Sequence, residues 1–278
     1  MTLIVTAAAV TARKQRNNQL AESRTECAAF FVGKNMQKTE LKLRYELVDI
    51  KENAMPVIIV AAGNSTRMNG VNKQFIKLQD IPLVARTLLC FENSAYVSRI
   101  ILVTKEEDIP SMQILAEKYS VSKLTDIVKG GANRQESVCN GMAMLKEDEN
   151  NVLIQDGARP FADERIIGDV AEALGEYSAA TCGVKVKDTV KEITKDGISA
   201  KTLNRDSLFA VQTPQGVRVK AYKSALARFE DLSVFTDDTS IMEAAGYKVK
   251  CVEGSYRNIK ITTPEDLIIA EFFLKEEY

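Results

Sequence analysis

The sequence predicts an α/β fold in which a doubly wound, mostly parallel sheet carries a projecting β-hairpin arm. From Met55 onward, apolar runs typical of strands alternate with helical patterns, as in sheets that helices cover on both faces. The runs are continuously apolar instead of alternating with polar residues, which indicates strands buried on both sides. A polar segment at about residues 186–210 interrupts the alternation and predicts the arm.

The predicted strands and helices follow one another in chain order. The predicted strands are VIIVAA (57–62), RIILVT (99–104), TDIVKG (125–130), NVLIQD (151–156), AATCGVKV (179–186) and KVKCVEG (248–254). The predicted helices cover residues 82–94, 110–120, 133–145, 163–177, 219–230, 239–246 and 262–277. The last of these has Thr263 as a predicted N-cap and Pro264 at the first helical position. In the arm, Asp196-Gly197 is a hairpin-turn signal between two short extended runs.

Residues 1–54 differ from the rest of the chain and are predicted to be an N-terminal extension, either poorly ordered or the result of a start placed too early. Residues 55–278 then form the catalytic domain, with Met55 as the natural start. Arg13 and Lys14 follow the first apolar run, whereas a secretory signal carries its positive charges before it. A plastid transit peptide is the alternative, and Glu22 and Glu26 argue against it.

Composition excludes several classes of function. The net charge of −1 gives no overall attraction to nucleic acid or to anionic membranes. No apolar run reaches the roughly 20 residues that span a bilayer. The five scattered cysteines favour a reducing compartment and contain no CxxC pair for a metal. Because the chain has no histidine, catalysis through a histidine base or a histidine-bound zinc is excluded.

The stretch VIIVAAGNSTRMNG (57–70) places small residues directly after a buried strand. It lacks the ending of a P-loop and the spacing of GxGxxG. Small residues let backbone N–H groups approach an anion, and Arg67 and Lys73 would add two cations. We therefore predict an anion-binding loop; the alternative is a plain strand–loop with two solvated cations.

A second motif, IQDGARPF (154–161), ends a buried strand with Asp156 and carries Arg159 three residues later. A buried carboxylate is costly unless it meets a cation. Asp156 is a candidate ligand for Mg²⁺, which binds one or two carboxylates together with substrate phosphates. The alternative is an Asp156–Arg159 ion pair that shapes the turn.

Two further motifs complete the candidate site. In GGANRQESV (130–138), the glycines allow close approach to a base or ribose, Asn133 and Glu136 fit a capping box, and Ser137 is a candidate hydroxyl for the nucleotide. The alternative is an ordinary helix N-terminus. In NIKITTPEDL (258–267), Lys260 lies in a predicted apolar strand and is expected to point out toward a phosphate, or else to solvent at an edge.

Together these motifs resemble the 2-C-methyl-D-erythritol 4-phosphate cytidylyltransferases of the non-mevalonate isoprenoid pathway. The resemblance covers about residues 55–275. Its motifs are AAGNSTRM, KQF, GGANRQESV, QDGARPF, VKDTVKE, NRDSLFAVQTPQG, FTDD and NIKITTPEDL. It implies a Rossmann-like nucleotidyltransferase that joins CTP to a methylerythritol phosphate with Mg²⁺ and releases pyrophosphate. It also implies a cytoplasmic, bacterial-type enzyme.

The resemblance implies a role for each matching residue. Arg67, Lys73 and Lys260 would stabilise the triphosphate and the transition state, and Asp156 would hold the metal. Ala61, Ala62, Gly63, Gly131, Ser137 and Asp156 would form the nucleotide site, and Arg159 and Thr213 the acceptor site. The arm would cross to the partner of a homodimer, so that Asp188, Thr189 and Arg205 help bind the partner's methylerythritol phosphate.

Three positions depart from the family pattern, and three rival functions remain. Gln155 stands where a histidine is frequent, Ala132 where some relatives have Asp, and Arg257 where some have an acid, which leaves a second metal carboxylate unassigned. A ribitol 5-phosphate cytidylyltransferase would share the CTP site. An NAD-dependent oxidoreductase would require different glycine spacing, and a non-catalytic nucleotide-binding module would lack at least one of the charged site residues.

Overall fold

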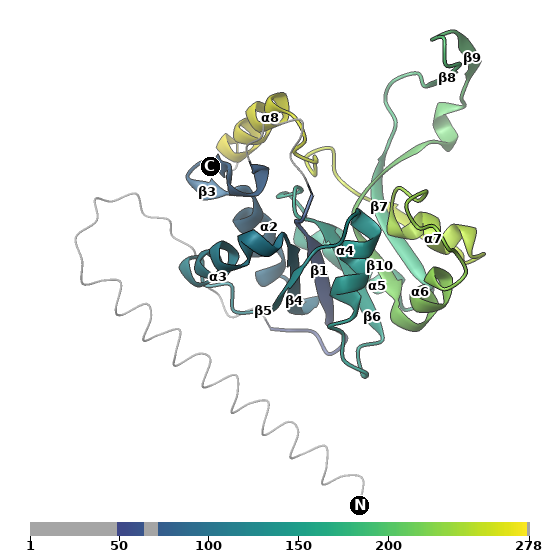
Figure 1. Ribbon diagram of the computed structural model, residues 1–278. Coiled ribbons are helices and arrows are strands. Elements are labelled where there is room, and N and C mark those ends of the chain that lie inside the picture. The colour runs from purple at the N-terminus through teal and green to yellow at the C-terminus, as the bar shows by residue number, and fades with distance from the viewer. Residues whose placement is uncertain (1–48, 64–71, 277–278) are drawn as a thin grey trace, which may run out of the picture. The chain divides into compact units, whose positions relative to one another are not determined.

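The computed structural model describes residues 49–63 and 72–276, and its centre is a seven-stranded sheet (Figure 1). The strand order is β11-β7-β10-β6-β1-β4-β5. All neighbours are parallel except that β10 runs antiparallel to β6 and β7. The bounds are β1 (Met55–Val60), β4 (Val97–Thr104), β5 (Leu124–Lys129), β6 (Asn151–Asp156), β7 (Ala179–Lys185), β10 (Phe209–Arg218) and β11 (Val249–Glu253).

Helices cover both faces of this sheet, which confirms the predicted fold class. Successive residues of β1 face opposite layers, since Val57 and Ile59 join one apolar core and Ile58 joins the other. The first core includes α2 (Leu83–Glu92), α3 (Ile109–Lys118) and α5 (Glu164–Ala173). The second includes α4 (Arg134–Met142), α6 (Val219–Leu226) and α7 (Asp238–Ala244).

Shorter elements extend this frame. The last helix, α8 (Pro264–Lys275), packs in a third, smaller apolar cluster beside the ribbon of β2 (Lys77–Leu78) and β3 (Ile81–Pro82). Three 3-10 helices, η2 (Lys73–Phe75), η3 (Glu106–Asp108) and η4 (Arg205–Ser207), lie in connections. No helix within residues 49–63 and 72–276 combines the length and apolarity that crossing a bilayer requires.

The predicted arm is a separate hairpin of β8 (Lys191–Ile193) and β9 (Ser199–Thr202), which extends away from the sheet in Figure 1. Gly197 adopts φ +78° at the turn, in the left-handed region that glycine tolerates best. The Asp-Gly turn signal therefore located the hairpin correctly. The arm's exposed side chains include Ile193 and Ile198, which lie on its tip and have no apolar cluster to join in the described part of the chain.

The structure adds one strand to those predicted and removes another. Strand β10 is absent from the predicted elements; its sequence FAVQTPQGVR contains Pro214 and Gly216, which disfavour strands. Lys260 was placed in a strand, whereas residues 254–263 connect β11 to α8 without forming one. Near Lys260 the backbone is held by the loop after β6, since the Ile261 N–H donates to the Ala158 carbonyl at 2.8 Å.

Both predicted helix caps are present, one with altered geometry. Thr263 and Asp266 form the capping box of α8, and Pro264 occupies the first turn as predicted. At α4, the Asn133 side chain accepts from the Glu136 N–H at 2.8 Å. The Glu136 carboxylate, however, accepts from the N–H of Ala132 at 2.9 Å, one residue before the cap. This bond fixes the loop that precedes α4.

Candidate active site

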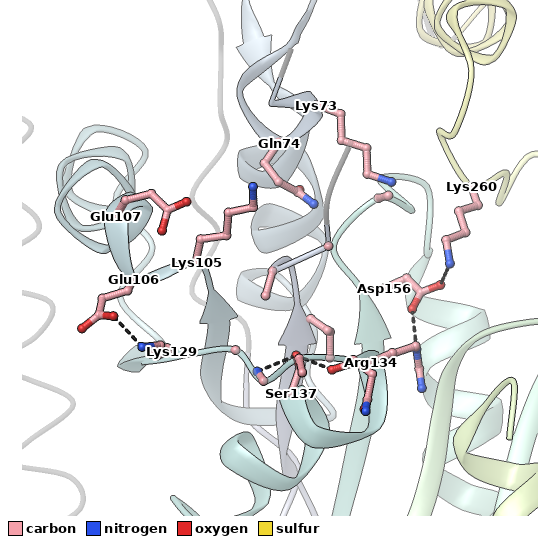
Figure 2. A pocket seen from close by; sticks show the side chains of 18 residues that line it. Lys73, Gln74, Lys105, Glu106, Glu107, Lys129, Arg134, Ser137, Asp156 and Lys260 are labelled. Carbon is pink, nitrogen blue, oxygen red and sulfur yellow. Dashed lines mark hydrogen bonds and ion pairs between the residues drawn. The ribbon is translucent and has the colours of Figure 1, made fainter. Parts of the chain in front are cut away.

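A cavity of about 580 Å³ lies at the carboxyl ends of the central strands, where a doubly wound sheet binds ligands (Figure 2). Val60 and Asp156 are partners in the β1–β6 register, so the loop after β1 begins beside the Asp156 carboxylate. The Gly130 N–H donates to the Thr104 carbonyl at 2.8 Å, which joins the ends of β5 and β4. The predicted site residues that line the cavity are Ala62, Gly63, Lys73, Gly131, Ser137, Asp156 and Lys260.

Asp156 is the electrostatic centre of the cavity. One carboxylate oxygen, Oδ2, lies 2.7 Å from Lys260 Nζ, and the other, Oδ1, lies 3.2 Å from Arg134 Nε. Its backbone N–H donates to Thr213 Oγ1 at 3.1 Å. Burial by itself would raise the pKa of the Asp156 carboxyl, but the charges of Arg134 and Lys260 outweigh it and hold that pKa well below its usual range. The carboxylate is therefore ionised.

The Asp156–Arg159 ion pair, the alternative for this motif, is present as a long contact, and Lys260 and Arg134 lie closer to the carboxylate. Arg159 Nε lies 3.8 Å from Asp156 Oδ2, which is too long for a hydrogen bond. The Arg159 guanidinium instead donates to the Asn258 carbonyl at 2.8 Å. Burial lowers the pKa of Arg159, and Asp156 opposes that change. Arg159 thus anchors the connection that carries Lys260, and it is absent from the cavity lining of the described residues.

Two lysines reach the cavity from segments far apart in the sequence. Lys73 comes from η2, and its Nζ donates to the Ile261 carbonyl at 3.3 Å, next to Lys260. The side chain of Lys260 remains 40% exposed, so its ammonium contacts both Asp156 and the open cavity. Figure 2 shows both side chains pointing into the cavity with Asp156 beneath Lys260. This convergence of cations around a carboxylate suits the binding of a phosphate chain.

The Gly130-Gly131 loop needs its glycines because of the protein around it. A Cβ on Gly130 would lie 2.3 Å from the Ala62 Cβ, and one on Gly131 would lie 2.2 Å from the Glu136 Cβ. Ser137 Oγ accepts from the Gly131 N–H at 3.0 Å and donates to the Asn133 carbonyl at 2.9 Å. Ser137 is buried, and these bonds make it a support of the loop; its contact with the nucleoside stays a prediction.

The remaining predicted residues lie elsewhere or outside the described residues. Ala61 is buried, and its N–H donates to the Val103 carbonyl. Thr213 is also buried and supports Asp156. The arm residues Asp188, Thr189 and Arg205 are exposed and do not line this cavity, and Arg205 donates to the Lys187 carbonyl at 2.8 Å. Arg67 falls within residues 64–71, which lie outside the described residues.

Sequence reasoning missed Arg134, which lines the cavity, and Asp238, which is buried behind it. Arg134 begins α4 and joins Asp156 to Asp238, whose Oδ2 lies 2.7 Å from Arg134 NH2. Both residues stand inside quoted motifs, GGANRQESV and FTDD. The available signal was an arginine at the first helical position, where the helix dipole favours acids. A nearby carboxylate offsets this unfavourable position.

Two of the three residues that depart from the family pattern hold neighbouring backbone in place. Gln155 is fully buried and donates from Nε2 to the Arg159 carbonyl at 3.0 Å, so it supports the turn after β6. Arg257 turns toward α8, where it donates to the Phe273 carbonyl at 2.6 Å. The described residues contain no group of three acidic or thiol side chains that would hold a metal by themselves.

The sequence and the fold are both similar to known proteins. A family model described as 2-C-methyl-D-erythritol 4-phosphate cytidylyltransferase matches residues 55–276. A protein of that name from Clostridium novyi is 47% identical and covers 78% of this chain and 95% of its own length. Its namesake from Clostridium acetobutylicum is 45% identical, with coverages of 79% and 96%.

Solved structures of similar fold include proteins of the same kind. The crystal structure of 4-diphosphocytidyl-2C-methyl-D-erythritol synthase from Anaerococcus prevotii matches with a TM-score of 0.71 at 32% identity, covering 80% of this chain and 96% of that one. A 2-C-methyl-D-erythritol 4-phosphate cytidylyltransferase structure from Thermus thermophilus matches with a TM-score of 0.64 at 27% identity, covering 80% and 99%.

Proposed function

The chain belongs to the 2-C-methyl-D-erythritol 4-phosphate cytidylyltransferase family, and we propose that the cavity at Asp156 is where it transfers CMP from CTP to 2-C-methyl-D-erythritol 4-phosphate. The products are 4-CDP-2-C-methyl-D-erythritol and pyrophosphate, a step of isoprenoid biosynthesis. One observation supports the assignment of the site. Lys260 Nζ and Arg134 Nε lie 2.7 and 3.2 Å from the Asp156 carboxylate oxygens, in the lining of a cavity that Lys73 also lines.

The chemistry suits a protein without histidine. A phosphate monoester has its second pKa near 6 and is mostly ionised at neutral pH, so the acceptor needs no general base. An oxygen of the acceptor phosphate forms a bond to the α-phosphorus of CTP. The bond from that phosphorus to the oxygen bridging to the β-phosphate breaks, and pyrophosphate leaves with the electron pair. The protein must therefore align the two reactants and stabilise negative charge.

Three cations are proposed to supply that stabilisation. Lys260 and Lys73 stand on one side of the cavity, where their ammonium groups can contact the triphosphate and the transferred phosphoryl group. Arg67 is proposed to stabilise the same phosphates because it stands in the AAGNSTRM motif that follows β1. Ala62 packs directly against Gly130, so the backbone around Ala62 and Gly63 and the Gly130-Gly131 loop form adjacent parts of the cavity lining, and these segments would hold the nucleoside.

Mg²⁺ fits this site as an ion that the protein and the substrate coordinate together. Asp156 offers one hard carboxylate at the cavity wall. Glu106 and Glu107 also line the cavity, but the described residues contain no group of three acidic or thiol side chains that could hold a metal by themselves. Mg²⁺ commonly binds one or two carboxylates and takes its other ligands from phosphates and water. When bound, it would neutralise charge on the phosphate chain. Asp156 would hold it, while Arg134 and Thr213 keep the carboxylate in place.

The arm supports the proposal of a homodimer whose sites are shared. Asp188, Thr189 and Arg205 are exposed and lie away from the cavity of their own chain. The hairpin that follows Asp188 and Thr189 projects from the sheet (Figure 1), and its apolar tip residues are uncovered. An arm of this kind reaches another subunit more readily than its own site. In a dimer, these residues would bind the methylerythritol phosphate of the partner's site.

Complementation between two inactive variants tests the shared site. We expect Asp156→Asn and Arg205→Ala chains, each of low activity alone, to recover about one quarter of wild-type turnover when refolded together in equal amounts, because half of the dimers then contain one intact site. Pyrophosphate release measures the recovery. Activity no higher than the mean of the separate variants would rule out sharing of Arg205 between subunits.

A bacterial-type cytoplasmic location is proposed as well. Cys90, Cys139, Cys182 and Cys251 are all free thiols, as a reducing compartment favours.

The function itself is tested by pyrophosphate release from CTP and Mg²⁺ with purified protein. We expect release with 2-C-methyl-D-erythritol 4-phosphate and none with ribitol 5-phosphate. Release with ribitol 5-phosphate alone would keep the CTP site and overturn the acceptor. No release with either acceptor, from folded protein, would indicate a non-catalytic nucleotide-binding module.

A further inference from the structure

Asp238 is a fully buried carboxylate at the start of α7. Its Oδ1 accepts a hydrogen bond from the Tyr222 hydroxyl at 2.8 Å, and its Oδ2 lies 2.7 Å from Arg134 NH2. A carboxylate in such a place costs free energy unless it is paired, and a buried ion pair stabilises a fold little better than an apolar pair of similar volume. Fold stability alone therefore does not account for Asp238.

Arg134 connects Asp238 to the candidate active site. Its Nε lies 3.2 Å from Asp156 Oδ1 while its NH2 contacts Asp238, so one planar guanidinium spans two carboxylates. Its NH1 is buried and has no hydrogen-bond partner within the described residues. Burial would lower the pKa of Arg134, but the two carboxylates raise it, so the bridge stays charged. The guanidinium is held by protein groups on both sides.

A second connection runs through β10. Thr213 accepts from the Asp156 N–H, and Gln215, two residues later, accepts from the N–H of Asp238 at 3.0 Å. Gln135, next to Arg134, also donates to the Phe235 carbonyl just before α7. The first turn of α7 is thus fixed to Asp156 both by the Arg134 side chain and by a strand of the sheet.

From this geometry we propose that Asp238 is a positioning residue for the transfer reaction, acting through Arg134 to fix the orientation of the Asp156 carboxylate. The proposal rests on the proposed function of Asp156. Without the Asp238 charge, the guanidinium is free to turn wholly toward Asp156 or away from it, and either movement changes the geometry that Asp156 offers to a cation. Asp238 touches neither the cavity nor any reacting atom.

The test uses Asp238→Asn, which keeps the size of the side chain and removes its charge. Partners of a metal ligand typically change metal affinity or activity by about 10–100-fold when mutated. We expect Asp238→Asn to lower kcat in that range and to weaken Mn²⁺ binding to the CTP complex about tenfold, as measured by electron paramagnetic resonance. Unchanged kcat and Mn²⁺ affinity, within twofold, with only a lower Tm would overturn the proposal.

Matched variants separate positioning from stability. Tyr222→Phe removes the other hydrogen bond to the same carboxylate and is expected to lower Tm while leaving Mn²⁺ affinity within twofold. Arg134→Lys keeps a positive charge but is too short to span both carboxylates, so we expect the same loss of Mn²⁺ affinity as for Asp238→Asn. If neither Asp238→Asn nor Arg134→Lys yields folded protein, the bridge is structural and the proposal fails.

The proposed function and the proposed role of Asp238 fail in distinguishable ways. Wild-type protein that lacks turnover with both acceptors would contradict that function, whereas the Mn²⁺ titration still reports whether Asp238 controls the Asp156 carboxylate.

Discussion

Asp156→Asn is expected to lower kcat about 1000-fold, which corresponds to about 4 kcal/mol of lost transition-state stabilisation. The substitution keeps the shape of the side chain but removes the negative charge that Lys260 and Arg134 approach at 2.7 and 3.2 Å. An amide binds a divalent cation more weakly than a carboxylate and does not balance the two cations. Steady-state pyrophosphate release at saturating CTP and acceptor measures the effect.

The control for this variant is Asp169→Asn, which removes an exposed carboxylate of α5 that pairs with Arg165 at 3.1 Å. An exposed ion pair of this kind contributes at most about 1 kcal/mol to stability, so turnover and Tm should both stay close to wild type. Near-normal turnover of the Asp156→Asn variant would contradict the proposed role of Asp156 in catalysis. A loss of circular dichroism signal at the assay temperature would instead indicate a folding defect.

Lys260→Gln should lower kcat about 100–1000-fold, the range found when one preorganised donor to a developing charge is removed. Among the residues that the structure describes, Lys260 carries the ammonium or guanidinium group closest to the Asp156 carboxylate, and its side chain remains 40% exposed. Glutamine retains a hydrogen-bond donor but no charge. Because Arg134 still pairs with Asp156, the fold should be retained, and the effect should appear in kcat more than in the Tm.

Lys220→Gln provides the matched control, since Lys220 is an exposed lysine on α6 outside the cavity lining. Its kinetics should equal those of the wild type. A Lys260→Gln variant that loses affinity for CTP but keeps its kcat would show that Lys260 binds substrate and transition state equally, contrary to the proposed catalytic role.

Local sequence patterns were sufficient for most of the frame. Continuous apolar runs such as VIIV located β1 because a strand covered on both faces has no polar side to interrupt it. Thr263 with Pro264 located the start of α8, and Asp196-Gly197 located the hairpin turn. These signals depend on residues that are close in the sequence, so they can be recognised without knowledge of the tertiary contacts.

The misplaced elements depend on contacts across the sheet. Strand β10 contains Pro214 and Gly216, which oppose a strand locally, but it is buried between β6 and β7 and pairs with both. Pairing with two neighbouring strands outweighs a weak local preference. The connection that holds Lys260 is likewise set by distant partners, among them the Ala158 carbonyl and the Arg159 guanidinium.

The sequence by itself determined the fold class, and it predicted a candidate site at the carboxyl ends of the strands with Asp156, Lys73 and Lys260, which the structure brings to one cavity. Only the tertiary structure decided what surrounds Asp156: a loose contact with Arg159, a close one with Lys260, and the Arg134 bridge to buried Asp238. The reason is that residue type and strand position are local properties, whereas the partner of a buried charge is chosen by which segments the sheet order brings together.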